Sequence, residues 1–319
     1  MQRAAALFTE CSALAASLAP SASAALAPTV LDCSWLPPGT SQRNLYEQRR
    51  IPTARFFDID AVSDTASPLP HMLPSAQAFA EHMRELRVSR SRPVVVYDRH
   101  GLLAAARVCW TLRAFGHPAA SVLVGGLPRW ESEGHAVEVG PPPPPAPAAA
   151  AAPLEPWALA PGAVRSVAQV RALSAAAAPA GAALPPAAPL LLDARATARF
   201  TGEAPEPRAG LAAGHIPGSA SLPFTALLQG EAARGLQLAP PERLAALLQA
   251  AGVHPARPGD IVLTCGSGVT SCVLLMALLA LGRDPSAMAV YDGSFAEWGL
   301  PEGGNAIGKG PSAHGARGA

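Results

Sequence analysis

Short apolar runs alternate with longer stretches rich in Ala and Leu along most of this 319-residue chain. The runs VVVY at 94–97, LLLD at 190–193 and IVLT at 261–264 have the length and composition of buried strands. Strands that alternate with helices predict a parallel sheet with helices on both faces. The stretch 269–281 is apolar on all sides, so we expect it to form a buried helix.

This pattern occurs twice in the chain. Four landmarks recur 165 to 168 residues further along, namely an Ile-Pro pair at 51 and 216, a strand end at 98 and 265, a helix-terminal Gly at 116 and 282, and a Trp at 130 and 298. Such agreement predicts one duplicated domain rather than a short-period solenoid. The expected fold class is therefore α/β, with two tandem domains.

A stretch rich in proline and alanine, residues 140–156, separates the two copies. Consecutive prolines favour an extended backbone without a packed core, so we interpret this stretch as a linker. The first domain then spans 5–139 and the second spans 157–302, with a flexible Gly-rich tail at 303–319. A further Ala- and Pro-rich segment, 174–189, is expected to form a loop inside the second domain.

Charge and hydropathy argue against binding to nucleic acid or to a membrane surface and against a membrane-spanning helix. The 24 basic and 23 acidic side chains give a net charge of +1, which argues against nucleic acid or an anionic membrane surface as the main partner. The strongest apolar run, 272–281, is far shorter than the roughly 20 residues of a membrane span.

The cysteines and the amino-terminal segment bear on the compartment. Five irregularly spaced cysteines argue against a disulfide framework or a zinc knuckle and favour a reducing compartment; they are Cys11, Cys33, Cys109, Cys265 and Cys272. Residues 5–18 fit either an organellar transit peptide or the first helix of the domain. We expect a cytoplasmic protein, with a mitochondrial location as the alternative.

The segment TCGSGVTSC at 264–272 follows an apolar strand and opens a helix. Gly266 and Gly268 allow the backbone to fold tightly around the sulfur of Cys265, and the amides of a helix amino terminus add positive potential. Both effects favour a thiolate and a bound persulfide, which suits double-displacement catalysis. A buried cysteine before a Gly-rich turn is the alternative interpretation, and we interpret Cys109 and Cys272 in that way.

The run CGSGVT at 265–270 resembles the active loop of the 3-mercaptopyruvate sulfurtransferases, which belong to the rhodanese superfamily. The resemblance extends over nearly the whole chain and includes SWLP at 34–37, FFDID at 56–60, HMLP at 71–74, GHIPGS at 214–219 and YDGS at 291–294. It implies two rhodanese-like domains and a sulfur transferred from 3-mercaptopyruvate through a Cys265 persulfide, with pyruvate released. The acceptor would be thioredoxin, another small thiol or cyanide, and the resemblance implies no cofactor and no metal.

The resemblance also implies roles for particular residues. Arg199 and Arg208 would bind the substrate carboxylate, a task that suits a planar guanidinium; two surface arginines in a loop are the alternative. Asp60 and His71, from the first domain, would assist the substrate together with Ser267; a hydrogen-bond cluster between the domains is the alternative. The remaining substrate contacts would come from the loop residues Gly266, Gly268, Val269 and Thr270.

Some positions depart from the family pattern. Arg50 and Thr53 flank the first Ile-Pro pair where the family has His and Gly, and Leu103 replaces a Tyr that often faces the substrate. These changes put substrate affinity in question. Asp98 stands in the place of the cysteine, so the first domain should carry no sulfur.

The sequence bears on three other activities of this fold. Thiosulfate sulfurtransferases typically have Arg and Lys after the cysteine, whereas Gly266 and Ser267 are neutral here, so thiosulfate is the alternative donor. A phosphatase of this fold would need Arg at position 271, which is Ser271. A catalytically silent binding module would usually have lost the cysteine.

Overall fold

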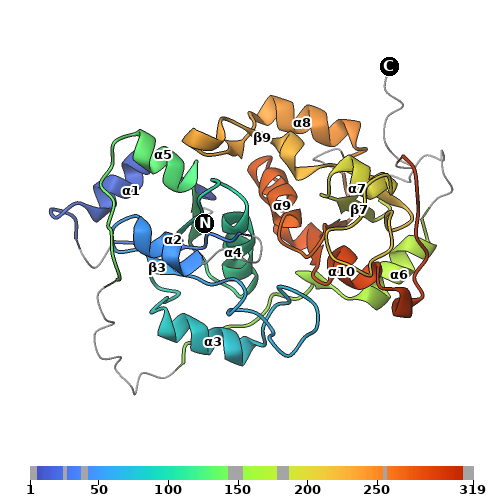
Figure 1. The fold of residues 1–319 in the computed structure, drawn as a ribbon, viewed down its shortest axis with the longest axis horizontal. Helices are drawn as coiled ribbons and strands as arrows, with labels where there is room; N and C mark the ends of the chain where they lie inside the picture. The colour runs from blue at the N-terminus through green and yellow to red at the C-terminus, as the bar shows by residue number, and fades with distance from the viewer. Residues whose placement is uncertain are drawn as a thin grey trace. The chain divides into compact units, whose positions relative to one another are not determined.

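The computed structural model describes residues 6–23, 27–36, 42–142, 154–177, 187–253 and 257–311. The chain divides into two compact units. The first comprises Met1–Thr65, Leu73–Ala160 and Gly230–Gln237, and the second comprises Ala66–Met72, Pro161–Gln229 and Leu238–Ala319. Figure 1 labels the helices and strands of both units.

The first unit contains a five-stranded sheet in the order β1-β5-β4-β2-β3, with every paired strand parallel. Its strands are β1 (Phe8–Thr9), β2 (Thr29–Asp32), β3 (Arg55–Phe56), β4 (Val94–Tyr97) and β5 (Ala120–Leu123). Its helices are α1 (Cys11–Leu18), α2 (Gln42–Gln48), α3 (Ala76–Glu85), α4 (Ala104–Ala114) and α5 (Gly126–Ser132). Helix α4 packs against β4 and β5.

The second unit contains a five-stranded parallel sheet in the order β6-β12-β11-β7-β8. Its strands are β6 (Val164–Arg165), β7 (Leu190–Asp193), β8 (Ser219–Ser221), β11 (Ile261–Thr264) and β12 (Met288–Tyr291). Its helices are α6 (Val167–Ala175), α7 (Thr197–Thr201), α8 (Pro241–Ala250), α9 (Ser271–Ala280) and α10 (Ser294–Trp298). Its shorter elements are η1 (Phe224–Leu227), β9 (Leu228–Gln229), η3 (Pro285–Ala287) and η4 (Pro301–Gly303). The short element η2 (Ala232–Arg234) belongs to the first unit, and β10 (Gln237–Leu238) lies where the chain passes from the first unit to the second.

The two sheets have the same strand order, so the predicted α/β fold of two tandem domains is confirmed. Strand β4 corresponds to β11, and these strands end immediately before Asp98 and Cys265. Because ligands of open parallel sheets bind at the carboxyl ends of the strands, this equivalence places the two residues at comparable sites in their domains.

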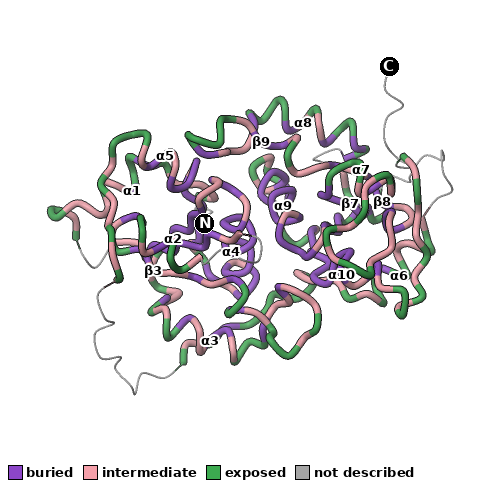
Figure 2. Tube along the Cα trace, in the orientation of Figure 1, coloured by how far each residue is buried: buried purple, intermediate pink, exposed green. Residues whose placement is uncertain are grey.

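The landmarks of the sequence repeat are core residues. Ile51 and Ile216 are fully buried, and Trp130 and Trp298 are almost so. Each tryptophan donates its indole N–H to a backbone carbonyl, at 2.8 and 3.0 Å. Helix α9, predicted to be buried, has its first eight residues buried, as the purple tube in Figure 2 shows. Burial on all sides explains why its apolar residues show no periodicity.

The predicted linker, inner loop and terminal segments can be compared with the structure only in part. Residues 143–153 of the predicted linker, 178–186 of the predicted loop and 312–319 of the tail lie outside the described residues. The predicted domain boundary at 157 falls within a stretch that packs in the first unit, where Trp157 contacts Phe79 edge-on. Residues 8–18 form β1 and α1 rather than one helix.

The beginning of the tail is held in place, contrary to the prediction of a flexible segment from 303 onward. Gly308 forms an antiparallel bridge with His215, with backbone hydrogen bonds of 2.8 and 2.9 Å. A side chain on Gly214 would collide with the Gly308 carbonyl, so the two segments pack backbone to backbone. Among the described residues, no helix is long and apolar enough to cross a membrane.

Two buried histidines should make stability depend on pH. Burial lowers the pKa of His117 and of His215, and the His215 ring stacks on Phe200 at 3.9 Å. Below about pH 6.5 the unfolded chain therefore binds protons that the folded protein does not, so stability should fall with pH from there toward the lowered pKa values. We expect Tm to decrease between about pH 7 and about pH 5.5.

The decrease should be shallower in His117→Gln and His215→Asn, even though both variants start from a lower Tm. Gln77→Ala, at an exposed position of α3 without a titratable group, serves as the control and should keep the wild-type slope. Equal slopes in all four proteins, measured by thermal denaturation, would show that other groups set the pH dependence.

Candidate active site

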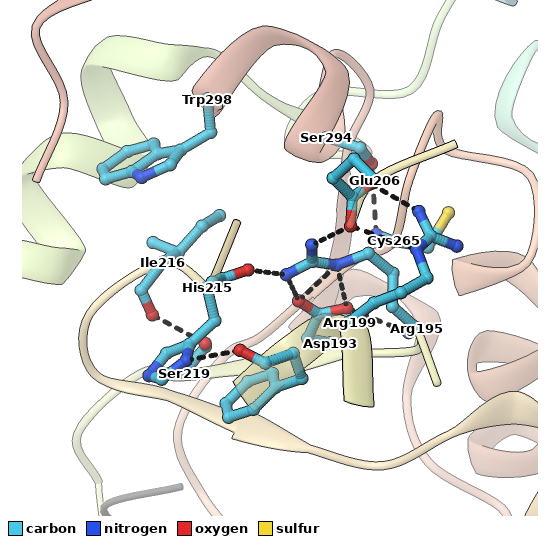
Figure 3. A network of polar contacts seen from close by, with 12 residues as sticks. Asp193, Arg195, Arg199, Glu206, His215, Ile216, Ser219, Cys265, Ser294 and Trp298 are labelled. Carbon is cyan, nitrogen blue, oxygen red and sulfur yellow. Dashed lines mark hydrogen bonds and ion pairs between the residues drawn. The ribbon is translucent and has the colours of Figure 1, made fainter. Parts of the chain in front are cut away.

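Cys265 lies directly after β11, in the loop that leads to α9, and it is 1% exposed. Three hydrogen bonds join this loop to the first three residues of α10. The Cys265 N–H donates to Ser294 Oγ at 3.2 Å, Phe295 N–H donates to the Cys265 carbonyl at 3.0 Å, and Ala296 N–H donates to the Gly266 carbonyl at 2.8 Å. The backbone on both sides of the cysteine is therefore fixed (Figure 3).

The two loop glycines are required for different reasons. Gly268 has φ +77°, the left-handed region in which a side chain is strained, and its carbonyl accepts hydrogen bonds from Ser271 Oγ and Cys272 Sγ. At Gly266 the constraint is space, because a Cβ there would lie 2.9 Å from Nη2 of Arg199. Gly266 therefore leaves room for the guanidinium of Arg199, a constraint additional to the predicted tight turn.

Arg199 comes from α7 and is held by a two-point ion pair with Glu206. Its Nε and Nη2 lie 3.0 and 2.6 Å from the two carboxylate oxygens. The Glu206 side chain is 2% exposed, whereas that of Arg199 is 25% exposed. Arg199 therefore lies against the loop of Cys265 in a fixed orientation and keeps part of its surface accessible to solvent, as an anion-binding group requires.

Glu206 is in turn held by a second, fully buried arginine. Arg195 donates to Glu206 at 2.8 Å, to Asp193 at 2.6 Å and to the Gly214 carbonyl at 2.9 Å, and its guanidinium lies 3.7 Å from the centre of the Phe295 ring. Burial alone would lower the pKa of Arg195, but the two carboxylates raise it. Two cations and two anions thus form one neutral network that reaches from the end of β7 to the loop (Figure 3).

This network was not identified from the sequence, although one signal was present. Asp193 ends a buried strand and Arg195 follows two residues later, and Glu206 lies two residues before Arg208. Charged residues so close to a strand end point to a site at the carboxyl edge of the sheet. Their pairing depends on the fold, because Arg195 and Glu206 are eleven residues apart.

The structure gives less information on the other predicted site residues. Arg208 is partly exposed. Asp60 belongs to the first unit and accepts a hydrogen bond from the Trp35 indole at 3.2 Å. His71 is buried, with φ +60°, in the segment 66–72 of the second unit. Ser267, in the loop itself, is 8% exposed.

Three of the other cysteines, Cys11, Cys33 and Cys109, are in environments that suppress reactivity. Burial raises the pKa of Cys11 to about 12 and that of Cys109 to about 11, and it raises the pKa of Cys33 well above its ordinary value. These side chains are therefore neutral thiols at physiological pH, and only a thiolate is a good nucleophile. No group of three or more possible metal ligands occurs among the described residues.

The equivalent loop of the first unit shows how this turn treats an anion. The Asp98 carboxylate accepts hydrogen bonds from four backbone N–H groups, those of His100, Gly101, Leu103 and Ala105, at 2.5–2.9 Å. Several amides that converge on one carboxylate form a strong anion site. Since Cys265 follows the equivalent strand, it occupies the position at which the first domain stabilises the negative charge of Asp98.

The family model for the rhodanese-like domain matches residues 19–133 and 176–300, one copy on each sheet. The chain belongs to the rhodanese family. Human 3-mercaptopyruvate sulfurtransferase is 39% identical over 274 residues, with 84% of each chain covered. Thiosulfate sulfurtransferase from Rattus norvegicus is also 39% identical, over 273 residues, and again 84% of each chain is covered.

The fold comparison agrees with the sequence comparison. The crystal structure of SseA from Escherichia coli, described as one of the 3-mercaptopyruvate sulfotransferases, matches with a TM-score of 0.70 and 33% identity. It covers 90% of this chain and 98% of SseA. The two rhodanese domains of this protein thus differ in one decisive respect, because the second has a cysteine where the first has Asp98.

Glu206→Ala should destabilise the second domain strongly. The substitution removes one of the two carboxylates that pair with the buried Arg195 guanidinium. Removing one partner of a buried ion pair typically costs about 3–5 kcal/mol of folding free energy. Thermal denaturation should show a clear decrease in Tm, and a smaller decrease in Glu206→Gln, which keeps the volume. Glu203→Ala, at an exposed position three residues away, should leave Tm unchanged. An unchanged Tm in Glu206→Ala would mean that the network contributes little to the fold.

Proposed function

We propose that this protein transfers sulfur from 3-mercaptopyruvate through a persulfide on Cys265 to a thiol or cyanide acceptor, with release of pyruvate. The observation that carries the proposal is the position of Arg199. Its guanidinium, fixed by Glu206, lies against the residue that follows the cysteine. A nucleophile and a group suited to a carboxylate are therefore adjacent in a rhodanese domain.

The chemistry of the donor fits this arrangement. The Cys265 thiolate attacks the donor sulfur, a sulfur–sulfur bond forms, and the bond between that sulfur and carbon breaks. The electron pair moves to the carbon next to the donor carbonyl and is held as an enolate, which takes up one proton to give pyruvate. An acceptor thiolate or cyanide then attacks the outer sulfur and regenerates the cysteine.

The loop supplies electrostatic stabilisation in both half-reactions. The backbone amides after Cys265 and the amino terminus of α9 favour negative charge on the thiolate and on the persulfide. The four amides on Asp98 in the duplicate domain support this role. We assign Gly266, Ser267, Gly268, Val269 and Thr270 to this loop site.

We assign the other predicted residues to the donor. Arg208 would bind the carboxylate together with Arg199, since two guanidinium groups can satisfy both oxygens. Asp60, His71 and Ser267 would assist proton transfer to the enolate, for which the histidine is best suited near neutral pH. These assignments rest on the resemblance in sequence.

The choice of donor rests on the loop rather than on overall similarity, because relatives named for mercaptopyruvate and for thiosulfate are equally similar to this chain. Gly266 and Ser267 are uncharged, whereas a dianionic donor such as thiosulfate is better served by cations beside the sulfur. The acceptor we propose is thioredoxin or a small thiol. We propose the cytoplasm as the location, with the mitochondrion as the alternative.

Cys265→Ser should abolish sulfur transfer without loss of the fold. Wild-type protein should turn over 3-mercaptopyruvate faster than thiosulfate and should leave an aryl phosphate intact. Cys109→Ala is the matched control, because that buried thiol is a poor nucleophile, and it should keep turnover. Transfer by a folded Cys265→Ser protein, or preference for thiosulfate in the wild type, would contradict the proposal.

Removing either arginine should weaken use of the donor. A hydrogen bond to a charged group is worth about 1.5–3 kcal/mol, so kcat/KM for 3-mercaptopyruvate should fall about ten- to a hundredfold in Arg199→Ala and in Arg208→Ala. A rise in KM at constant kcat would indicate binding alone. Arg243→Ala, an exposed arginine of α8, should behave as wild type. Unchanged kinetics in one of the two variants would remove that arginine from the site.

A further inference from the structure

Ser294, the first residue of α10, has an unusual backbone conformation. Its φ is +50°, in the left-handed region that disfavours any residue with a side chain, and it is fully buried. Strain of this kind persists where the surrounding structure enforces it and is common at functional sites. A role for the serine hydroxyl would explain why this position is not occupied by glycine, which adopts a positive φ without strain.

The duplicate domain supplies the comparison. Its equivalent turn, between β5 and α5, contains Gly125 and Gly126, and Gly126 has φ +56°. Leu127 N–H donates to the Asp98 carbonyl at 3.1 Å, just as Phe295 N–H donates to the Cys265 carbonyl at 3.0 Å. The fold thus uses the unstrained residue where it holds an aspartate and the strained serine where it holds the cysteine.

The Ser294 hydroxyl connects the ends of two neighbouring strands. It accepts the hydrogen bond from Cys265 N–H at 3.2 Å and donates to the Tyr291 carbonyl, at the end of β12, at 2.8 Å. Without the hydroxyl, the buried N–H of Cys265 would lack this acceptor and the peptide could rotate. A rotation at the Cα of Cys265 would carry the sulfur with it.

We infer that Ser294 is a positioning residue for Cys265, one that fixes the cysteine peptide at the expense of local backbone strain. The inference rests on the proposed function. Ser294 acts through the backbone and touches neither donor nor acceptor, so its effect should appear in the chemical step. Binding of the donor carboxylate, which we assign to the arginines, should be unaffected.

Two variants separate the hydroxyl from the strain. Ser294→Ala removes the hydroxyl and keeps the strain, whereas Ser294→Gly removes both. We expect kcat with 3-mercaptopyruvate to fall by about tenfold in both, the effect of losing one buried hydrogen bond, with KM nearly unchanged. Ser294→Gly should have a higher Tm than Ser294→Ala, because glycine adopts a positive φ without strain.

Arg87→Gly is the matched control. Arg87 also has a positive φ, +51°, but it is exposed and follows α3 in the first unit. The substitution should raise Tm and leave kcat at the wild-type value. Wild-type kcat in Ser294→Gly, a rise in KM at constant kcat, or an equal fall of kcat in Arg87→Gly would each overturn the inference.

A measurement without donor separates this inference from the proposed function. The rate at which iodoacetamide alkylates Cys265 across a pH series, followed by peptide mass spectrometry, should change in both Ser294 variants and remain unchanged in Arg87→Gly. If wild-type protein turned over no sulfur donor, the proposed function would fail, yet the alkylation rates would still decide the role of Ser294. Identical alkylation profiles in wild type and Ser294→Gly would overturn it.

Discussion

The backbone of Cys265 is held between the carboxyl ends of two parallel strands, and the rest of the site depends on this attachment. Hydrogen bonds from the turn after β12 fix the cysteine peptide on both sides. The loop that follows can then direct its backbone amides toward the sulfur, and α9 begins directly after this loop. Because α9 is buried on all sides, the loop has a rigid support.

A buried charge network adds the second fixed element. Asp193 and Glu206 hold Arg195, and Glu206 also orients Arg199 against Gly266. A long arginine side chain loses much rotamer entropy when it binds an anion, and the network removes that cost in advance. The neutral balance of two cations and two anions also allows the arrangement to be buried, which one unpaired charge would not permit.

Most of the fold could be predicted from the sequence, because strand burial and helix burial leave direct traces in the hydrophobic pattern. The runs that became β4, β7 and β11 and the duplication were identified for this reason. Cys265 could be identified because it precedes a glycine-rich strand–helix turn within a run, CGSGVT, that resembles the active loop of a known family. The tail at 303–311 was predicted wrongly, since composition cannot reveal that Gly308 pairs with His215.

The residues that support the site could not be predicted in the same way. Glu206 and Arg195 meet only through the fold, and nothing in the run YDGS indicates that Ser294 adopts a positive φ. At Gly266 the sequence gives no sign of the approach of the Arg199 guanidinium, which comes from a residue 67 positions earlier in the chain. These contacts join residues that the fold brings together, so a local sequence pattern does not encode them.

The central claim is that Cys265 itself carries the sulfur. The most direct test is intact-mass analysis of the protein after incubation with 3-mercaptopyruvate in the absence of an acceptor, with fragment ions used to locate the modification. The account predicts a gain of one sulfur atom per chain, located on Cys265 and removed by an added thiol. No gain in mass, or a sulfur located on Cys33 or Cys272, would contradict it.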